Sequence, residues 1–202
     1  MPAIWTRLAP GIAALALALA SGAANADDCD FLTGGGFIII QRADGDAKAN
    51  FGVGGACKDG GDQHGLWGHL EYIDHGTGTS IQTQLPLNVH WTSITGYSKD
   101  VSDTSDRTRF ICGTARTNQI YGDVNFVVRA RDGEPGVMDE FDIELRTGGT
   151  LVQGGVLVYT TDLLLLPPHH QLSGGNIQLH NPNRSTTGTF SDPASCPGVV
   201  GG

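Results

Sequence analysis

The sequence predicts an all-β fold, in which an antiparallel meander of eight or nine strands forms a small β-barrel or a barrel-like sandwich. Short segments alternate apolar and polar residues with a period of two, which is typical of antiparallel strands over a single core. Glycine is abundant, with 30 residues, and glycine-rich turns separate most of these segments. After residue 26, no amphipathic stretch is long enough to predict a helix. Closure is favoured because an open sheet would expose its first and last strands as edges.

The strands are expected at regular intervals along the chain. In the second of them, Ala49, Phe51 and Val53 share one face, while Lys48 and Asn50 share the other. The same alternation recurs in DVNFVVRAR (123–131), DEFDIELR (139–146) and GNIQLHN (175–181), and turns such as ADGD and RDGEPG separate strands. The expected strands begin near Gly36, Lys48, Leu66, Leu87, Thr108, Val124, Glu140, Leu151 and Gly175.

The first 26 residues have the pattern of a secretory signal peptide. They contain one basic residue, Arg7, then an apolar run, and then the sequence ANA before Asp27. This pattern predicts cleavage after Ala26 and a secreted or periplasmic protein. The apolar run is too short to span a bilayer as a resident helix. Residues 27–202 are expected to form a single β-domain, with its core at about 33–181 and a flexible tail from about 182.

The chain is acidic, with a formal net charge of −9 at pH 7, and cleavage of the leader would also remove Arg7. Phosphate binding requires a basic surface, so this charge argues against nucleic acid and equally against anionic lipid as a partner. No segment after residue 26 resembles a membrane span. The glycine runs precede strands rather than helices, so they predict no phosphate loop, and no cofactor is expected. The expected partner is an extracellular or cell-surface ligand, and the oligomeric state stays open.

The four cysteines predict two disulfides, because an even number in an exported protein indicates oxidised pairs. Zinc ligation is the alternative, but no two cysteines have the C-x-x-C spacing that zinc sites commonly use. Of the three pairings that four cysteines allow, we favour Cys29–Cys196, which would link the two ends of the domain, together with Cys57–Cys112.

Six phrases occur in a distinctive order along the chain: TGGGFI (33–38), AKANFGV (47–53), YIDHGTG (72–78), VHWTSIT (89–95), DGEPGVMDEFDI (132–143) and GGNIQLH (174–180). Together they resemble a family of exported bacterial β-domains labelled post-COAP, over about Thr33 to His180. The resemblance implies an exported all-β module, often attached to larger surface or secreted proteins. It implies no reaction.

The chain departs from that family by an insertion, VLVYTTDLLLLPPHHQLS, at about residues 156–173. Its leucine run comprises Leu163, Leu164, Leu165 and Leu166. One interpretation is a longer hairpin whose leucines cover one end of the barrel. The other is an exposed apolar loop that contacts a partner. The adjacent His169 and His170 are expected to point in opposite directions on an extended chain, which disfavours a shared metal.

The segment GHLEYIDHG (68–76) concentrates two histidines, a glutamate and an aspartate. Alternation places Leu66, Gly68, Leu70, Tyr72 and Asp74 on the core side, and Trp67, His69, Glu71, Ile73 and His75 on the other side. His69, Glu71, Asp74 and His75 are a candidate metal or acid–base cluster, with His90 or His180 as cross-strand partners. One strand alone cannot supply the three or four ligands of a zinc site. The alternative is a solvated strand face and a turn, where Asp74 caps backbone donors and Gly76 supplies a positive φ.

A second acidic cluster lies in RDGEPGVMDEFD (131–142), where Asp132, Glu134 and Asp139 precede Asp142. Their oxygens could bind calcium outside the cell, but the residue order of an EF-hand is missing. A tight hairpin turn through Asp132-Gly133 and Pro135-Gly136 explains the same residues without an ion. The sequence therefore assigns no metal.

The sequence favours a non-catalytic exported β-module that binds or contacts a ligand outside the cell. It contains no G-x-S-x-G motif and no Ser/His/Asp order that indicates nucleophilic catalysis. One alternative is a small β-barrel enzyme, a hydrolase or an isomerase, which would gather the residues of the GHLEYIDHG segment in a buried cluster. Another is a small-ligand carrier, which requires a cavity inside the barrel.

Overall fold

The computed structural model of the chain describes residues 29–42, 45–58, 65–76, 86–150, 153–161, 168–186, 188–192 and 196. The regular structure in these residues is all β, as predicted, and they contain no helix long and apolar enough to cross a membrane. The expected signal peptide and the leucine run 163–166 lie outside these residues. The strands are β1 (Phe31–Ile40), β2 (Ala47–Cys57), β3 (Leu66–Asp74), β4 (Leu87–Lys99), β5 (Thr108–Thr117), β6 (Asp123–Arg131), β7 (Glu140–Thr147), β8 (Val156–Thr160) and β9 (Gly174–His180).

The nine strands form one antiparallel sheet in the order β8-β7-β6-β5-β4-β3-β2-β1-β9. The predicted meander is confirmed, and most strands begin within one residue of the expected position. Two strands differ: β1 begins at Phe31 rather than near Gly36, and β8 begins at Val156 rather than near Leu151. The glycine run belongs inside β1 because β9 passes close to it. A Cβ at Gly36 would lie 2.2 Å from the carbonyl oxygen of Gly174.

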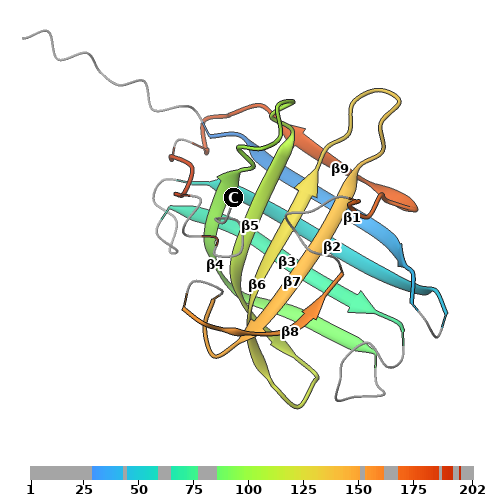
Figure 1. The fold of residues 1–202 in the computed structure, drawn as a ribbon. Coiled ribbons are helices and arrows are strands. Elements are labelled where there is room, and N and C mark those ends of the chain that lie inside the picture. The colour runs from blue at the N-terminus through green and yellow to red at the C-terminus, as the bar shows by residue number, and fades with distance from the viewer. Residues whose placement is uncertain are drawn as a thin grey trace, which may run out of the picture.

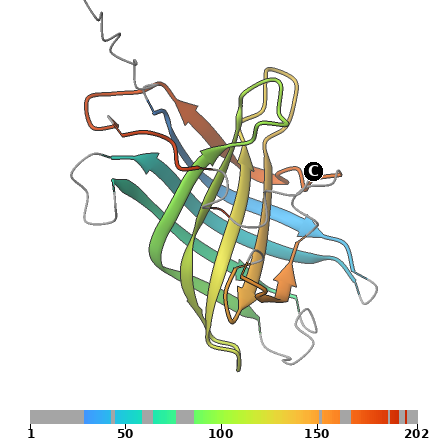
Figure 2. The same cartoon turned by 60° about the vertical axis from the view of Figure 1, so that its left-hand side comes forward.

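The sheet bends so that β5, β6 and β7 lie across the core from β1, β2 and β3 (Figure 1 and Figure 2). Inward side chains of the two halves meet: Phe51 of β2 stacks on Phe141 of β7, with ring centroids 3.9 Å apart. Tyr72 of β3 lies 5.9 Å from Tyr159 of β8, again between ring centroids. Aromatic pairs of this kind add about 0.5–1.5 kcal/mol to the burial of their surface. Aromatic and aliphatic side chains thus pack the space between the halves.

The sheet ends at β8 and β9, and no strand ladder joins these two in the described part of the chain, so the predicted barrel closure is not shown. Carboxylates cover the outer edge of β9 instead. Asp139 accepts a hydrogen bond from the Ile177 N–H at 2.6 Å, and Asp132 accepts one from the Leu179 N–H at 2.8 Å. Just before β9, the Leu172 N–H donates to the Asp139 carbonyl at 2.9 Å. Side chains therefore satisfy donors that a closing strand would otherwise bind.

Two disulfides are present, as predicted, but the favoured pairing is wrong. Cys29 is bonded to Cys57, and Cys112 is bonded to Cys196. The register explains the first bond: Phe31 pairs with Ala56, so the residues that flank β1 and β2 meet at the same end of this hairpin. The second bond fixes the C-terminal segment to β5.

The segment after β9 packs on the sheet, in contrast to the flexible tail expected from about residue 182. The Ser191 N–H donates to the Tyr97 carbonyl at 2.8 Å, and the Phe190 ring stacks on Tyr97 at 5.6 Å. The Arg109 guanidinium lies 5.5 Å from the Phe190 ring. These contacts and the bond at Cys196 hold the described part of residues 182–196 against the strands.

Candidate functional site

Rings from β9, β1 and β3 form a row on the outer face of the sheet, which is interrupted at β2. On β1, Phe31 is opposite His180 of β9 on one side and Ala56 of β2 on the other. Ala56 is in turn opposite Trp67 of β3. The Phe31 ring stacks on the His180 imidazole at 4.3 Å between centroids, whereas the Trp67 side stays open, with 42% of the residue exposed. The small Ala56 between them leaves a gap in the row.

That gap is a hollow with a volume of about 190 Å³. The strands contribute Phe31, Thr33, Ala56, Lys58 and Trp67 to its lining. The turn after β9 contributes Asn183, Ser185 and Thr186. Sites that enclose a whole small molecule usually measure about 300–1,000 Å³. The hollow is therefore suited to hold one ring or one edge of a larger ligand.

The turn that borders the hollow is held by its own hydrogen bonds. The Asn183 Oδ1 accepts from the Ser185 N–H at 2.8 Å and from the Ser185 hydroxyl at 2.6 Å. The Thr186 Oγ1 accepts from the Asn183 N–H at 2.9 Å. Beneath the opposite side, the buried Cys29–Cys57 disulfide joins the start of β1, which carries Phe31, to the end of β2, which carries Ala56. Both sides of the hollow are thus pre-organised, which reduces the entropy lost on binding.

Farther along the same face, beyond the His69 imidazole, lies a bare strip in which two strands have glycines opposite each other. Gly35 of β1 is directly opposite Gly52 of β2, and next to this pair lie Asn176 of β9 and Glu71 of β3. A Cβ at Gly52 would meet nothing within 4 Å. Between the strip and the hollow, the His69 imidazole covers Gly54, whose Cβ would lie 2.8 Å from that ring. The backbone of two strands is therefore directly accessible at Gly35 and Gly52.

The four residues of the GHLEYIDHG cluster do not come together, because the predicted alternation divides them between the two faces. His69, Glu71 and His75 lie on the outer face, and Asp74 is fully buried. Glu71 binds the Nδ1 of His90, one of the two cross-strand histidines considered from the sequence, because the register places it opposite Glu71 on β4. The His75 imidazole bonds the Asn50 side-chain oxygen at 3.1 Å.

Asp74 anchors the end of the core. Its carboxylate binds the Arg42 guanidinium and accepts a 2.7 Å hydrogen bond from the Tyr159 hydroxyl. It also accepts the Gly76 N–H at 2.9 Å, which confirms the predicted turn cap. The predicted positive φ at Gly76 is wrong. This glycine is required because Arg42 lies against it: a Cβ there would be 1.8 Å from the guanidinium Nη1.

His69 lies beside the hollow, next to the Trp67 ring at 5.8 Å between centroids. Partial burial lowers the pKa of His69 below its ordinary value of 6.5, and the charge of Glu71 only partly opposes this effect. The lowered pKa favours the uncharged form of the imidazole next to Trp67 at neutral pH.

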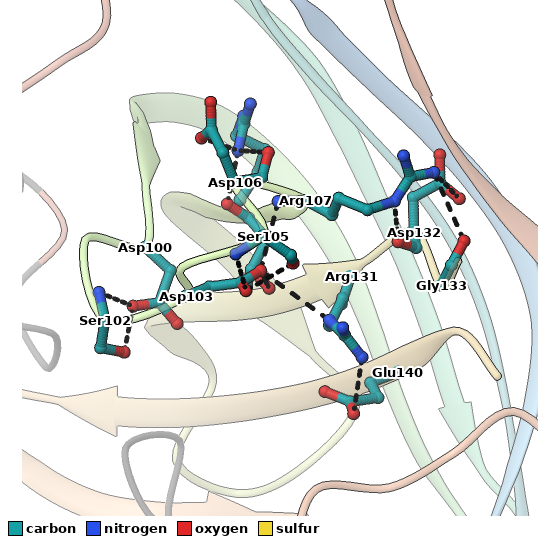
Figure 3. Close-up of polar contacts among 12 residues, drawn as sticks. Asp100, Ser102, Asp103, Ser105, Asp106, Arg107, Arg131, Asp132, Gly133 and Glu140 are labelled. Carbon is teal, nitrogen blue, oxygen red and sulfur yellow. Dashed lines mark hydrogen bonds and ion pairs between the residues drawn. The ribbon is translucent and has the colours of Figure 1, made fainter. Parts of the chain in front are cut away.

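The acidic cluster of residues 132–139 binds N–H groups at the edge of the sheet. It also pairs with a neighbouring arginine (Figure 3). The Arg107 side chain donates to the Asp132 carbonyl at 2.7 Å and pairs with the Asp132 carboxylate at 2.8 Å. The Asp139 Oδ1 accepts the Gly133 N–H at 2.8 Å. Glu134 is exposed in the turn. The oxygens of Asp132 and Asp139 thus bind protein donors, as in the hairpin interpretation.

A further buried carboxylate, Asp142 of β7, binds both adjacent histidines of the insertion. His169 and His170 bond its two oxygens through their Nδ1 atoms at 3.1 and 2.8 Å, although they were expected to point apart. Burial raises the pKa of Asp142, but these two bonds outweigh it and hold the pKa below its ordinary value. Across the described residues, no three His, Cys, Asp or Glu side chains are placed to hold a metal ion.

Comparison with protein-family models, with curated proteins and with solved structures gives no match for this chain. The hollow itself was not predicted from the sequence. Alternation placed Trp67 on the polar face of β3, and a large aromatic residue there was the available signal. Phe31, Thr186 and Trp67 are far apart in the chain, however, and only the register of four strands brings them together.

Proposed function

We propose that the protein is an exported, non-catalytic β-module that binds an extracellular or cell-surface ligand on the outer face of β9, β1, β2 and β3. The observation that carries the proposal is the exposed indole of Trp67 at the edge of a pre-organised hollow. Tryptophan is the residue type that most often dominates the energy of a binding surface. The shallow hollow supports contact with part of a large ligand.

The placement of the polar residues supports binding over catalysis. An enzyme built on the GHLEYIDHG segment would need its four polar residues around one reacting atom. Asp74 faces the core, while Glu71 and His90 form a pair with 53% and 66% of their side chains exposed. Acid–base groups gain most of their effect in sites that exclude water. An exposed pair on a flat strand face is a better surface contact than a catalytic centre.

The packing of the core also supports an outer-face site over a carrier with an internal cavity. The stack of Phe51 on Phe141 and the Tyr72–Tyr159 hydrogen bond of 2.6 Å occupy the space between the two halves of the sheet. A ligand in this space would have to displace buried rings.

The two disulfides indicate an oxidising environment outside the cytoplasm. The proposal adds export by the leader 1–26 and membership of the post-COAP-type β-domains. Mass spectrometry of the exported chain tests the leader: the account expects an N-terminus at Asp27 and a mass four hydrogens below that of the fully reduced chain. A mass that retains residues 1–26 would contradict export by cleavage.

Tryptophan fluorescence tests the site. Trp67 is the sole tryptophan in a Trp5→Phe/Trp91→Phe variant, since the chain has three. We expect one class among soluble neutral polysaccharides, alginate and gelatin to protect Trp67 from acrylamide quenching in a saturable manner. Protection by none of the three, in a variant with normal unfolding, would contradict a binding surface at Trp67.

A further inference from the structure

We propose that the ligand of this face is a chain of uncharged sugar units, an inference that rests on the proposed binding function. The first support is the shape of the hollow. A pyranose ring has C–H faces that are apolar and hydroxyl groups around its edge. The exposed Trp67 indole offers an apolar plane of matching size, and the Phe31 ring lies on the other side of Ala56.

The second support is the chemistry of the rim, which is mainly uncharged. Thr33, Ser185 and Thr186 offer hydroxyl oxygens, and the Asn183 amide offers Nδ2 donors because its Oδ1 is occupied by Ser185. Sugar hydroxyls donate and accept, so they match such a set. The lowered pKa of the adjacent His69 favours its uncharged form.

The third support comes from the partners that this face disfavours. The net charge of −9 repels anionic polymers such as nucleic acid or acidic glycans, and among the described residues that line the hollow Lys58 is the one cation. Peptides commonly bind as an added strand at a sheet edge. Here β1 and β2 pair on both sides beside the hollow, so their backbone is already bonded within the sheet, and β3 pairs with β2 along the hollow and with β4 over Glu71–Asp74.

The fourth support is the bare strip, which indicates a chain rather than a single sugar. Gly52 lies four residues before Ala56 on β2, a separation of about 13 Å along a strand. Without side chains at Gly35 and Gly52, a polymer seated at Trp67 can continue close to the backbone towards Asn176 and Glu71.

Affinity electrophoresis tests the inference with three soluble neutral polysaccharides (dextran, a mixed-linkage glucan and a galactomannan) and with alginate as the anionic glycan. We expect at least one neutral polymer to retard the protein. Trp67→Ala should weaken this binding by about ten-fold or more, the loss typical of a central tryptophan. Ile73→Ala is the matched control, because Ile73 is 39% exposed on the same face of the same strand but lies outside the hollow.

Gly52→Val tests the strip separately. A Cβ at Gly52 meets open space, and a β-branched residue suits a strand, so the variant should fold normally by chemical unfolding. We expect it to weaken binding of the polymer several-fold while it leaves binding of a disaccharide fragment unchanged. Unchanged polymer binding by both Gly52→Val and Trp67→Ala would overturn the inference.

The outcomes separate the two proposals. Protection of Trp67 by alginate or gelatin alone, with no retardation by any neutral polymer, would overturn the sugar ligand and keep the binding face. Retardation by a neutral polymer that Trp67→Ala abolishes and Ile73→Ala retains supports both. Failure of every probe to protect Trp67 or to retard the protein would contradict both.

Discussion

Asp74 illustrates how a single residue connects distant parts of this chain. Its carboxylate binds Arg42, which follows β1, and Tyr159, which lies on β8. The Tyr159 hydroxyl also bonds the Tyr72 hydroxyl at 2.6 Å, which continues the polar chain into the core. Burial raises the pKa of both tyrosines well above the ordinary value, so both stay neutral donors. The network holds one end of the bent sheet.

We expect Asp74→Asn to lower the free energy of unfolding by about 3 kcal/mol, because it leaves the Arg42 guanidinium with no carboxylate partner at a site that is largely buried. Urea unfolding measures the change. Glu71→Gln is the control on the same strand: it is exposed, and a change within about 0.5 kcal/mol is expected. Equal losses in the two variants would contradict a special role for Asp74.

Asp103 makes the free energy of unfolding decrease at low pH. Burial raises its pKa, but hydrogen bonds from the Ser105 and Thr108 hydroxyls, both at 2.6 Å, and from two backbone N–H groups outweigh this (Figure 3). The pKa is therefore held well below its ordinary value of 3.8. A lowered folded-state pKa contributes stability that is complete above the unfolded value and is lost as the pH falls below it.

Asp103→Asn should therefore reduce stability at neutral pH and flatten the loss of stability below the ordinary value of 3.8. Urea unfolding at several pH values, from about 7 down to about 3, gives the two slopes. Asp142, whose pKa is also lowered, keeps part of the acid slope in the variant. A slope in Asp103→Asn as steep as in the unchanged protein would show that Asp103 does not carry this dependence.

For individual residues, the sequence predicted which face of the sheet each side chain occupies but not which groups it contacts. A period of two correctly assigned Asp74 inward and His69, Glu71 and His75 outward. The role of Asp74 depends on contacts with distant side chains, which the local sequence pattern does not reveal. Arg42 and Tyr159 are 32 and 85 residues from Asp74 along the chain. The sequence left His90 and His180 as alternative cross-strand partners, and the β3–β4 register places His90 opposite Glu71.

Among the elements, β9 depends most on side chains for its position. It pairs with β1 on one side, and its other edge donates to Asp139 and Asp132. Both aspartates belong to the connection that leads into β7, so the last strand is attached to the far half of the sheet. This arrangement also blocks an edge that could otherwise pair with another chain.

Asp139→Ala is expected to lower the free energy of unfolding by about 1–3 kcal/mol, because the N–H groups of Gly133 and Ile177 lose their acceptor. Glu134→Ala, in the same connection but exposed, should change it by less than about 0.5 kcal/mol. Denaturant unfolding of both variants checks the difference. A neutral Asp139→Ala would mean that water replaces the carboxylate at no cost and that β9 is held by β1 alone.

The two disulfides should differ in function. Removal of Cys112–Cys196, which spans 84 residues, should destabilise by about 4–5 kcal/mol, against about 3–4 kcal/mol for Cys29–Cys57, which spans 28. Only Cys29→Ala/Cys57→Ala should weaken ligand binding at a temperature where both variants are folded, because this bond joins the chain next to Phe31 and Ala56, which line the hollow. Calorimetry and fluorescence titration measure the two effects. Equal loss of binding in both variants would contradict this assignment.

The elements were largely predictable because each strand needs only its own alternation and its own turns. The exceptions arose where a strand depends on another segment. The glycines of β1 were expected to precede the strand, and their place inside it depends on β9, just as the cysteine pairing depends on the β1–β2 register. The return of the last strand to β1 leaves no local trace in the sequence.

For the whole molecule, the proposed binding site and the packed core lie on opposite faces of one bent sheet. The inner face packs aromatic and aliphatic side chains between its halves, and the outer face of β9, β1, β2 and β3 carries Trp67, the hollow and the bare strip. Substitutions on the outer face should therefore alter binding while unfolding stays nearly constant. The sequence predicted which side chains of the strands face the core, but the position of the hollow required the complete strand order.

The most direct test of the account is an amide NMR titration of the protein with a soluble fragment of the neutral polysaccharide that retards it. The account predicts shifts concentrated at Thr33, Gly52, Ala56 and Trp67, with the amides of β5, β6 and β7 unchanged. Shifts confined to β5–β7 or to the Arg42–Asp74 end would contradict an outer-face site at Trp67.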